Sequence, residues 1–450
     1  MAAAGAGQRA WVVEVEKAVV DADAAVEVSR WQRHSIYLVP SCIKDLRPKA
    51  YKPQVVSLGP FHHDDPELVS MEEHKRRALR HLLRRANKPL EAFAAAVEEV
   101  ADELASTYLD LGAEWREGEG KERFIEMMVV DGCFLLEVMR ATGLDYAPND
   151  PIFSRHGAVY MVPYIRRDML MLENQLPLLL LERIVAVETA KPPVNFTMCS
   201  LLIVFQCQVA RSQNSDAINR MVLRFMSPRP MPRSVSSLGL HALDLHRRNM
   251  LYGYYQTPRW RSDDMSVDAD IIRSAVELHE AGVRFKKSHT ESLHDIRFRR
   301  GVLSTPAITV DDSTEHMFLN MMAFERLHVG AGNDVTAYVF FMDNIIDSAK
   351  DVALLSSNGI IQNAVGSDKA VAELFHSINK DVVLEEDNAL DAVHREVNAY
   401  CRKPWNQWRA NLIHTYFQSP WAFMSLAAAV FLLVMTTMQI VYTVLGFYQK

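Results

Sequence analysis

An uncharged apolar run near the C-terminus constrains this chain more than any other feature of its sequence. No Asp, Glu, Lys or Arg lies between Phe417 and Gln449. A helix crosses a bilayer core with about 20 apolar residues, and this run is longer than that. Trp421 near its start and Tyr442 near its end resemble the aromatic belts of membrane helices. We therefore predict a transmembrane anchor over residues 417–448.

The charges that flank this run predict its orientation. Arg402, Lys403 and Arg409 precede it in a basic juxtamembrane segment, residues 401–416, and no acidic residue follows Glu396. Basic flanks stay on the cytosolic side, so the main domain is expected in the cytosol. The N-terminal region has no apolar stretch typical of a secretory signal. The predicted localisation is a single-pass, tail-anchored protein of the plasma membrane or endoplasmic reticulum, with the membrane itself as one partner.

Composition excludes several other classes of protein. The chain has 450 residues, a formal net charge of −7 and 23% charged residues. This balance is typical neither of a basic nucleic-acid binder nor of an acidic disordered chain, so no nucleic-acid partner is expected. The five cysteines are Cys42, Cys133, Cys199, Cys207 and Cys401. They form no CxxC pair, which argues against a disulfide framework or a zinc ribbon.

Apolar spacing predicts a mainly α fold, a large helical domain with a small β element. Helical periodicity covers residues 66–85, 90–109, 121–139 and 166–187, and Pro177 is expected to kink or split the last of these. Two short apolar stretches around Arg299-Arg300-Gly301 predict a β hairpin at about 294–310. The expected domain organisation is a variable N-terminal segment, residues 1–35, followed by a single domain, residues 36–400. Pro, Ser and Arg replace periodic apolar positions at about 190–268, which predicts a loop-rich insertion there.

Two acidic positions lie within apolar sequence. Asp131 falls in the apolar stripe of the 121–139 helix, and Glu173 begins a polar triplet inside MLMLENQLPLLLL. An unpaired buried carboxylate costs several kcal/mol, so each of them needs a partner. One interpretation is a general acid or base with a shifted pKa, and a catalytic Asp131/Glu173 pair is conceivable. The other, which we favour, is an internal structural anchor.

Other motifs do not assemble into a recognisable site. His62-His63-Asp64-Asp65 is interpreted as a solvated turn, because adjacent side chains rarely converge on one metal. Glu291–His294 lacks the second ExxH motif of a di-iron bundle. The basic helix HKRRALRHLLRR, which includes Lys75, is interpreted as a solvated face or an attraction for anionic lipids. We therefore assign no catalytic, cofactor-binding or metal residues.

A colinear series of motifs resembles one plant family. The motifs are IYLVP (36–40), YKPQVVSLGPFHH (51–63), MEEHKRRAL (71–79), VVDGCFLLEV (129–138), DMLMLENQLPLLLL (168–181), ELHEAGVRF (277–285), HMFLNMMAFE (316–325), DVALLSSNGII (351–361) and HTYFQSPW (414–421). In these segments the chain resembles the plant-specific domain-of-unknown-function 247 family. The resemblance implies a largely helical plant protein with a C-terminal membrane anchor and no established enzyme activity.

Architecture and resemblance together favour a recognition or signalling protein over an enzyme. Some grass members of the family are linked to self-incompatibility recognition, which makes protein partners the expected ligands. The alternative is a hydrolase or transferase with an internal site near Asp131 and Glu173. An open cleft that unites these carboxylates would favour the enzyme, whereas burial against structural partners would favour the binding protein.

Overall fold

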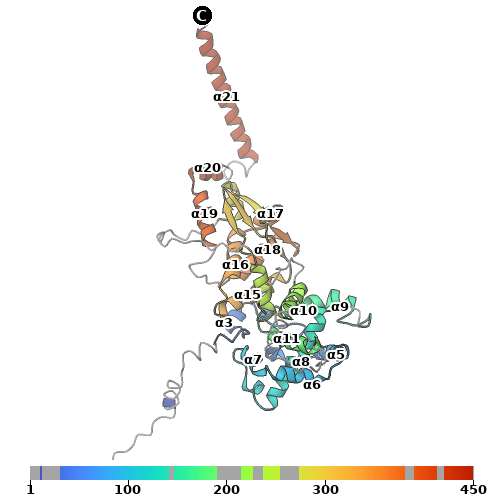
Figure 1. Cartoon of the computed structure of the whole chain (residues 1–450). Coiled ribbons are helices and arrows are strands. Elements are labelled where there is room, and N and C mark those ends of the chain that lie inside the picture. Colours follow the sequence, from blue (N-terminus) through green and yellow to red (C-terminus); the bar gives the residue numbers. More distant parts are fainter. Residues whose placement is uncertain are drawn as a thin grey trace, which may run out of the picture. The chain divides into compact units, whose positions relative to one another are not determined.

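The computed structural model describes residues 11–12, 31–140, 146–189, 214–226, 237–253, 273–380, 390–412 and 420–448. It divides into two compact units, and Figure 1 labels many of their helices. Unit 1 comprises Met1–Asn249 and Glu315–Gly332, and unit 2 comprises Met250–Thr314 and Asn333–Lys450. Much of the expected 190–268 insertion lies outside the described residues, as do Cys199 and Cys207. Its two described stretches contribute helices, and Ile218 and Val222 are fully buried there.

Unit 1 is helical. Its elements are α3 (Ser41–Lys44), α4 (Pro48–Tyr51), the 3-10 helix η1 (Pro60–His62), α5 (Val69–Ala86), α6 (Leu90–Glu98), α7 (Ala101–Ser106), the 3-10 helix η2 (Ala113–Trp115), α8 (Glu119–Arg140), α9 (Arg155–Tyr160), α10 (Val162–Asp168), α11 (Leu178–Thr189) and most of α13 (Ala242–Leu251) and α15 (Thr314–Leu327). Helix α8 is the centre of this unit, because α5, α6 and α11 all pack against it.

Gly132 shows how closely α8 and α11 approach. A Cβ at this position would lie 2.5 Å from the Ile184 Cδ1 atom and 3.1 Å from a methyl group of Leu180. Pro177 lies immediately before α11, so the long apolar stretch forms two helices, α10 and α11, with a polar connection between them. The predicted split at Pro177 is therefore observed, and the connection carries Glu173.

Unit 2 combines helices with two small sheets. Its elements are α14 (Ala275–Glu280), β1 (Arg284–Lys287), β2 (Arg297–Arg299), β3 (Val302–Thr305), β4 (Ile308–Val310), α16 (Asp334–Ile345), α17 (Ala349–Ser357), β5 (Ile361–Asn363), α18 (Asp368–Ile378), α19 (Asp391–Cys401), α20 (Pro404–Leu412) and α21 (Pro420–Tyr448). Strand β3 pairs in parallel with β1 and antiparallel with β2, while β4 pairs in parallel with β5.

The β2–β3 hairpin corresponds to the predicted β element. Phe298 pairs with Leu303, and Arg300 and Gly301 form the two-residue turn between the strands. Both turn residues have positive φ, 51° and 77°. A tight hairpin turn of this kind requires positive φ at both positions, which is why a glycine follows the arginines. The mainly helical fold with a small sheet is thus observed.

The predicted transmembrane helix is wrong. Helix α21 is long, but across the part of the chain that the structure describes, no helix combines the length and apolarity needed to cross a membrane. The sequence of α21 includes the polar residues Thr436, Thr437 and Gln439. The expected anchor at 417–448, the membrane as a partner through it and the single-pass localisation are therefore not supported.

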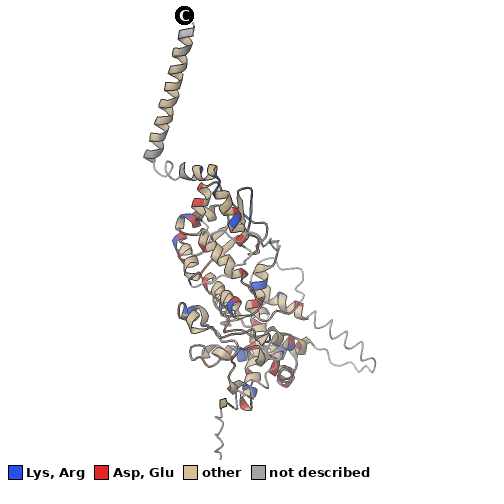
Figure 2. Ribbon diagram, turned by 90° about the vertical axis from the view of Figure 1, so that its left-hand side faces the viewer, with Lys and Arg blue, Asp and Glu red and all other residues tan. Residues whose placement is uncertain are grey.

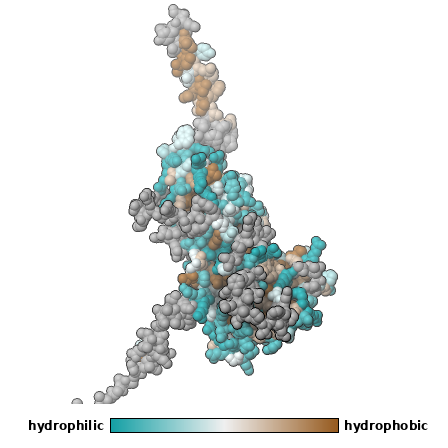
Figure 3. All heavy atoms as spheres, in the orientation of Figure 1, coloured by the Kyte–Doolittle hydropathy of each residue, from teal (hydrophilic) through white to brown (hydrophobic). Residues whose placement is uncertain are grey.

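Charged and apolar side chains are interspersed over the visible surface. Lys and Arg are interspersed with Asp and Glu on the ribbons of both units, whereas α21 carries neither (Figure 2). The face shown in Figure 3 is mainly hydrophilic over both units, with apolar residues in small patches and along α21. Large buried side chains such as Phe93, Phe134 and Phe341 lie in the cores.

Candidate functional site

Polar side chains hold the 54–62 segment in the interior of unit 1. The Asp168 carboxylate accepts hydrogen bonds from the backbone N–H groups of Gln54, Val55 and Val56 at 3.1, 2.7 and 3.0 Å. The Asn174 side chain accepts from the Leu58 N–H at 2.7 Å and donates to the Val56 carbonyl at 3.0 Å. Asp168 and Asn174 are both fully buried. They therefore supply hydrogen-bond partners for residues 54–58, whose backbone lies in neither a helix nor a sheet.

Asp131 binds the same segment from α8. Its carboxylate accepts a hydrogen bond from the Gly59 N–H at 2.9 Å and lies 2.7 Å from the Lys75 ammonium. Lys75 also donates to the Ser57 hydroxyl at 3.0 Å and contacts Glu72 at 2.6 Å. The Asp131 and Lys75 side chains are essentially inaccessible to solvent. Burial raises the pKa of Asp131 above its usual value, while Lys75 and the Gly59 N–H oppose that shift.

Gly59 has no room for a side chain. Its φ is 79°, and a Cβ would lie 2.8 Å from the Tyr108 hydroxyl and 3.0 Å from the Gln175 carbonyl. The Tyr108 hydroxyl itself donates to that carbonyl at 2.9 Å. Asp131 therefore holds a backbone turn that only glycine can form here.

Glu173 has a different set of partners. Its carboxylate accepts from the Val39 N–H at 2.8 Å and from the Lys44 ammonium at 2.8 Å, and it lies 3.1 Å from the Nε2 atom of His62. Burial opposes ionisation of this group, but the contacts with His62, Lys44 and Val39 together lower its pKa. Glu173 is therefore a charged anchor that ties three separate segments together.

Asp131 and Glu173 do not form a shared carboxylate pair. Each has its own cationic partner, and no hydrogen bond or ion pair joins them among the described residues. Both contact the 54–62 segment, Asp131 at Gly59 and Glu173 at His62. Their side chains are 1% exposed, which leaves no access for a substrate. This arrangement supports the structural interpretation of both residues.

The other sequence candidates diverge in space. In the 62–65 turn, His63 packs edge-on against Trp115, Asp64 pairs with Arg123 and Asp65 pairs with Lys52. Within the described ranges no three His, Cys, Asp or Glu side chains gather as a metal site would require. In unit 2, His294 pairs with Asp334 at 3.2 Å.

Lys75 is the interior residue that the sequence interpretation missed. It was grouped with the basic face of α5, yet its side chain is completely buried. The signal was present, because Met71, Lys75, Ala78 and Leu82 follow one another at spacings of four and three along α5. The same reasoning that placed Asp131 in an apolar stripe applies to this lysine.

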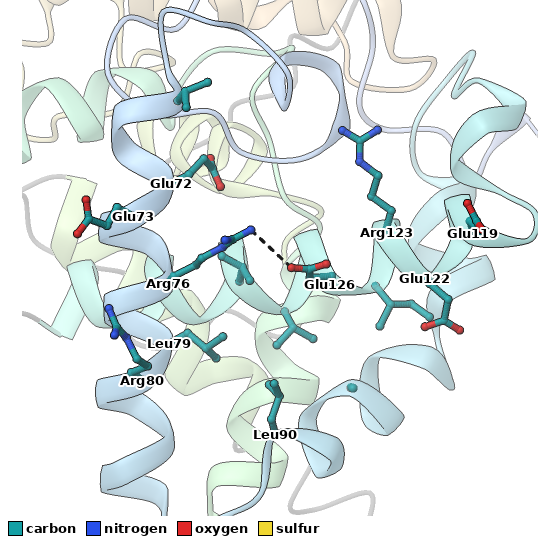
Figure 4. Close-up of a pocket in the computed structure, with 15 residues that line it drawn as sticks. Glu72, Glu73, Arg76, Leu79, Arg80, Leu90, Glu119, Glu122, Arg123 and Glu126 are labelled. Atoms are coloured by element: carbon teal, nitrogen blue, oxygen red, sulfur yellow. Dashed lines mark ion pairs between the residues drawn. The ribbon is translucent and has the colours of Figure 1, made fainter.

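An open groove lies on the other side of α5 and α8. Figure 4 shows these two helices as its lips and the start of α6 at its base. Its volume is about 1110 Å³. The apolar floor consists of Val69, Leu79, Leu90, Ala94, Ile125, Val129 and Val130. The charged lips consist of Glu72, Glu73, Arg76 and Arg80 from α5 and Glu119, Glu122, Arg123 and Glu126 from α8. We call this site the α5–α8 groove.

Two apolar side chains of the groove are exposed to solvent: Val69 is 57% exposed and Leu90 is 46% exposed. Leu79, Ile125 and Val129 also line the groove, and their side chains are buried. A large concave site with an apolar floor and a charged rim is typical of a surface that binds another molecule. The groove has no counterpart among the sequence predictions, because residues of three helices build it.

These features define a mainly helical protein with an open external groove and an interior set of buried polar contacts. We call the buried contacts of Asp131, Asp168, Glu173 and Asn174 the polar frame. The family model described as "plant protein of unknown function", domain of unknown function 247, matches residues 36–435, and the chain belongs to this family. It is 30% identical to UPF0481 protein At3g47200 of Arabidopsis thaliana, over 92% of this chain and 86% of that protein. It is 25% identical to the putative UPF0481 protein At3g02645 of the same plant, over 96% of this chain and 94% of that protein. No solved structure matches the chain.

Proposed function

We propose that this protein is a recognition protein that binds a segment of a partner polypeptide in the α5–α8 groove. The observation that carries the proposal is the open apolar floor, where Val69 and Leu90 are about half exposed beside buried Ile125 and Val129. Burial of such a surface by a partner contributes roughly 25 cal/mol per Å² before the costs of association.

The rigidity of the groove supports this role. Lys75 on α5 and Asp131 on α8 form a buried ion pair directly behind the lips. Helices α5 and α8 also make the most extensive helix–helix contact of the unit. A preformed groove loses little conformational entropy when a ligand binds, which favours affinity.

The interior carboxylates support binding more than catalysis. Asp131 and Glu173 each have a cationic partner and a backbone N–H donor, and neither lines the groove. A general acid or base must reach its substrate within hydrogen-bond distance. These two residues instead support the frame that holds the groove in shape.

Site-specific photo-crosslinking tests the proposal. The full chain carries a photoreactive phenylalanine at position 90 and is irradiated in plant cells that express it. We expect a crosslinked polypeptide. The crosslink should be lost when the chain also carries Val69→Glu, because the ligand would have to bury the new carboxylate and would bind more weakly. The matched control places the same group at Val329, which is 94% exposed outside the groove. Equal labelling from positions 90 and 329, or none from position 90, would contradict the proposal.

A further inference from the structure

We propose that the occupant of the α5–α8 groove is an amphipathic helix whose basic end lies against Glu119 and Glu122. This inference deepens the proposed function and rests on it, because it names the kind of segment that the groove takes. It follows from the shape of the floor and from the charges of the lips.

The floor matches the apolar side of one helix. Ile125 and Val129 are four residues apart on α8, so they lie on one face and form a short apolar row. Leu79 extends this row from α5, and Leu90 closes its base (Figure 4). A helix that binds in such a groove inserts side chains spaced three and four residues apart. The volume of about 1110 Å³ is at or above the upper end of small-molecule pockets, which favours a peptide.

Several lip charges already have partners within unit 1. Glu72 contacts Lys75, and Arg123 pairs with Asp64 while its guanidinium lies over the Trp115 ring. These side chains are therefore not free to select a ligand.

The other lip charges are unequal in sign. The side chains of Glu73, Glu119, Glu122 and Arg80 make no hydrogen bond or ion pair with any of the described residues, although Glu73 lies close enough to His74 to interact with it electrostatically. All four are exposed. Three carboxylates against one guanidinium favour a ligand with basic residues.

The charges also give the groove a direction. Glu119 and Glu122 lie at one end of the groove, and Arg80 lies near the opposite end (Figure 4). A bound helix carries partial positive charge at its N-terminus and partial negative charge at its C-terminus. The favourable orientation places the ligand's first turn, with its Lys or Arg residues, at the two glutamates and its last turn near Arg80.

One ion pair crosses the groove and must separate when a ligand binds. Arg76 and Glu126 face each other from the two lips at 3.8 Å, and their side chains are 69% and 66% exposed (Figure 4). An exposed pair at this distance contributes little to stability, so a ligand opens it at small cost. After it opens, Glu126 extends the acidic row that Glu119 and Glu122 begin.

Selection from a displayed peptide library tests the inference. The library consists of helices about four turns long, with leucine fixed at alternating third and fourth positions and random residues elsewhere. It is selected against the full chain, against Leu90→Glu and against the double variant Glu119→Lys/Glu122→Lys. The matched control is Glu98→Lys/Glu99→Lys, which makes the same charge change at exposed residues outside the groove. Unchanged thermal unfolding confirms that each variant folds.

We expect lysine and arginine to be enriched in the first turn of the selected peptides. The Glu119→Lys/Glu122→Lys variant should bind such a peptide about tenfold more weakly and should select acidic residues instead, whereas the control should behave like the parent. Selection that depends on Leu90 but shows no charge preference, or the same preference on the charge-reversed variant, overturns this inference and leaves the proposed function standing. Selection that does not depend on Leu90, or selection of no peptide at all, overturns both the inference and the proposed function. Binding of a second copy of the chain at this face in place of peptides overturns the inference alone.

Discussion

The inner and outer faces of helices α5 and α8 each carry a pair of opposite charges, but the two pairs have different roles. On the inner face Lys75 and Asp131 are fully buried and 2.7 Å apart. On the outer face Arg76 and Glu126 are mostly exposed and 3.8 Å apart. Lys75 and Arg76 are neighbours in sequence, so the rotation of about 100° per residue along a helix alone separates a structural charge from a surface charge. The role of a charged residue in these helices therefore depends on which face of the helix carries it.

The largest expected effect comes from breaking the inner pair. Lys75→Ala leaves the buried Asp131 carboxylate without its cation, and we expect a loss of about 3–5 kcal/mol in the free energy of unfolding. Arg76→Ala on the outer face should change it by less than about 0.5 kcal/mol. Urea denaturation of the two variants measures the contrast. Similar losses for both would show that the two faces do not differ as described.

Acid should weaken unit 1 through a third kind of group, a buried side chain kept neutral. Burial lowers the pKa of His241 to about 4, while its unfolded value is near 6.5. Between these values the unfolded chain binds more protons, so the free energy of unfolding should fall as the pH drops from 6.5 to 4, by up to roughly 3 kcal/mol. His241→Asn should reduce this pH dependence in denaturation curves. An unchanged dependence in the variant would exclude His241 as its source.

Loss of the Asp168 hydrogen bonds should lower the free energy of unfolding somewhat less than loss of the inner ion pair. Asp168→Ala leaves three backbone N–H groups of the 54–62 segment without an acceptor, and we expect a loss of about 2 kcal/mol. The matched control is Asp102→Ala, since the Asp102 side chain is 92% exposed. Thermal unfolding measures both, and equal stability of the two variants would argue against a frame built by Asp168.

A capping residue in unit 2 gives a smaller effect that is independent of the groove. Asp351 completes a capping box with Ser348 at the start of α17 and accepts a hydrogen bond from the Val276 N–H at 2.8 Å. Asp351→Ala should cost about 1 kcal/mol of stability and leave peptide binding in unit 1 unchanged. Calorimetry with and without a selected peptide checks both expectations. A loss of binding in this variant would mean that the site depends on more than unit 1.

Local patterns predicted much of the fold. The turn residues Arg300 and Gly301 located the hairpin, and Pro177 located the break between α10 and α11. These signals operate over a few residues, which is why sequence alone reveals them. The pairing of β4 with β5 joins residues about fifty positions apart and has no comparable local signal. The apolar run near the C-terminus predicts a membrane-spanning helix from its composition alone. Among the described residues, no helix has the length and apolarity that such a span requires.

The site was predictable only in part. Asp131 was expected to need a partner, but Lys75 was interpreted as a surface residue because its neighbours Arg76 and Arg77 are basic. Asp168 and residues 54–56, which it contacts, are more than a hundred positions apart in sequence, so no local periodicity predicts these contacts. The α5–α8 groove depends on how three helices pack, which no single stretch of sequence encodes.

One paired measurement tests the account most directly. Thermal unfolding and equilibrium binding of a selected peptide are measured, at a temperature where each protein is folded, for the parent, Asp131→Asn and Leu90→Glu. We expect Asp131→Asn to unfold at a lower temperature and still bind, because Asp131 holds the frame behind the groove. Leu90→Glu should unfold like the parent and bind at least about tenfold more weakly, because Leu90 is half exposed at the base of the groove. A folded Asp131→Asn protein that no longer binds, or a Leu90→Glu protein that binds as well as the parent, would contradict the account.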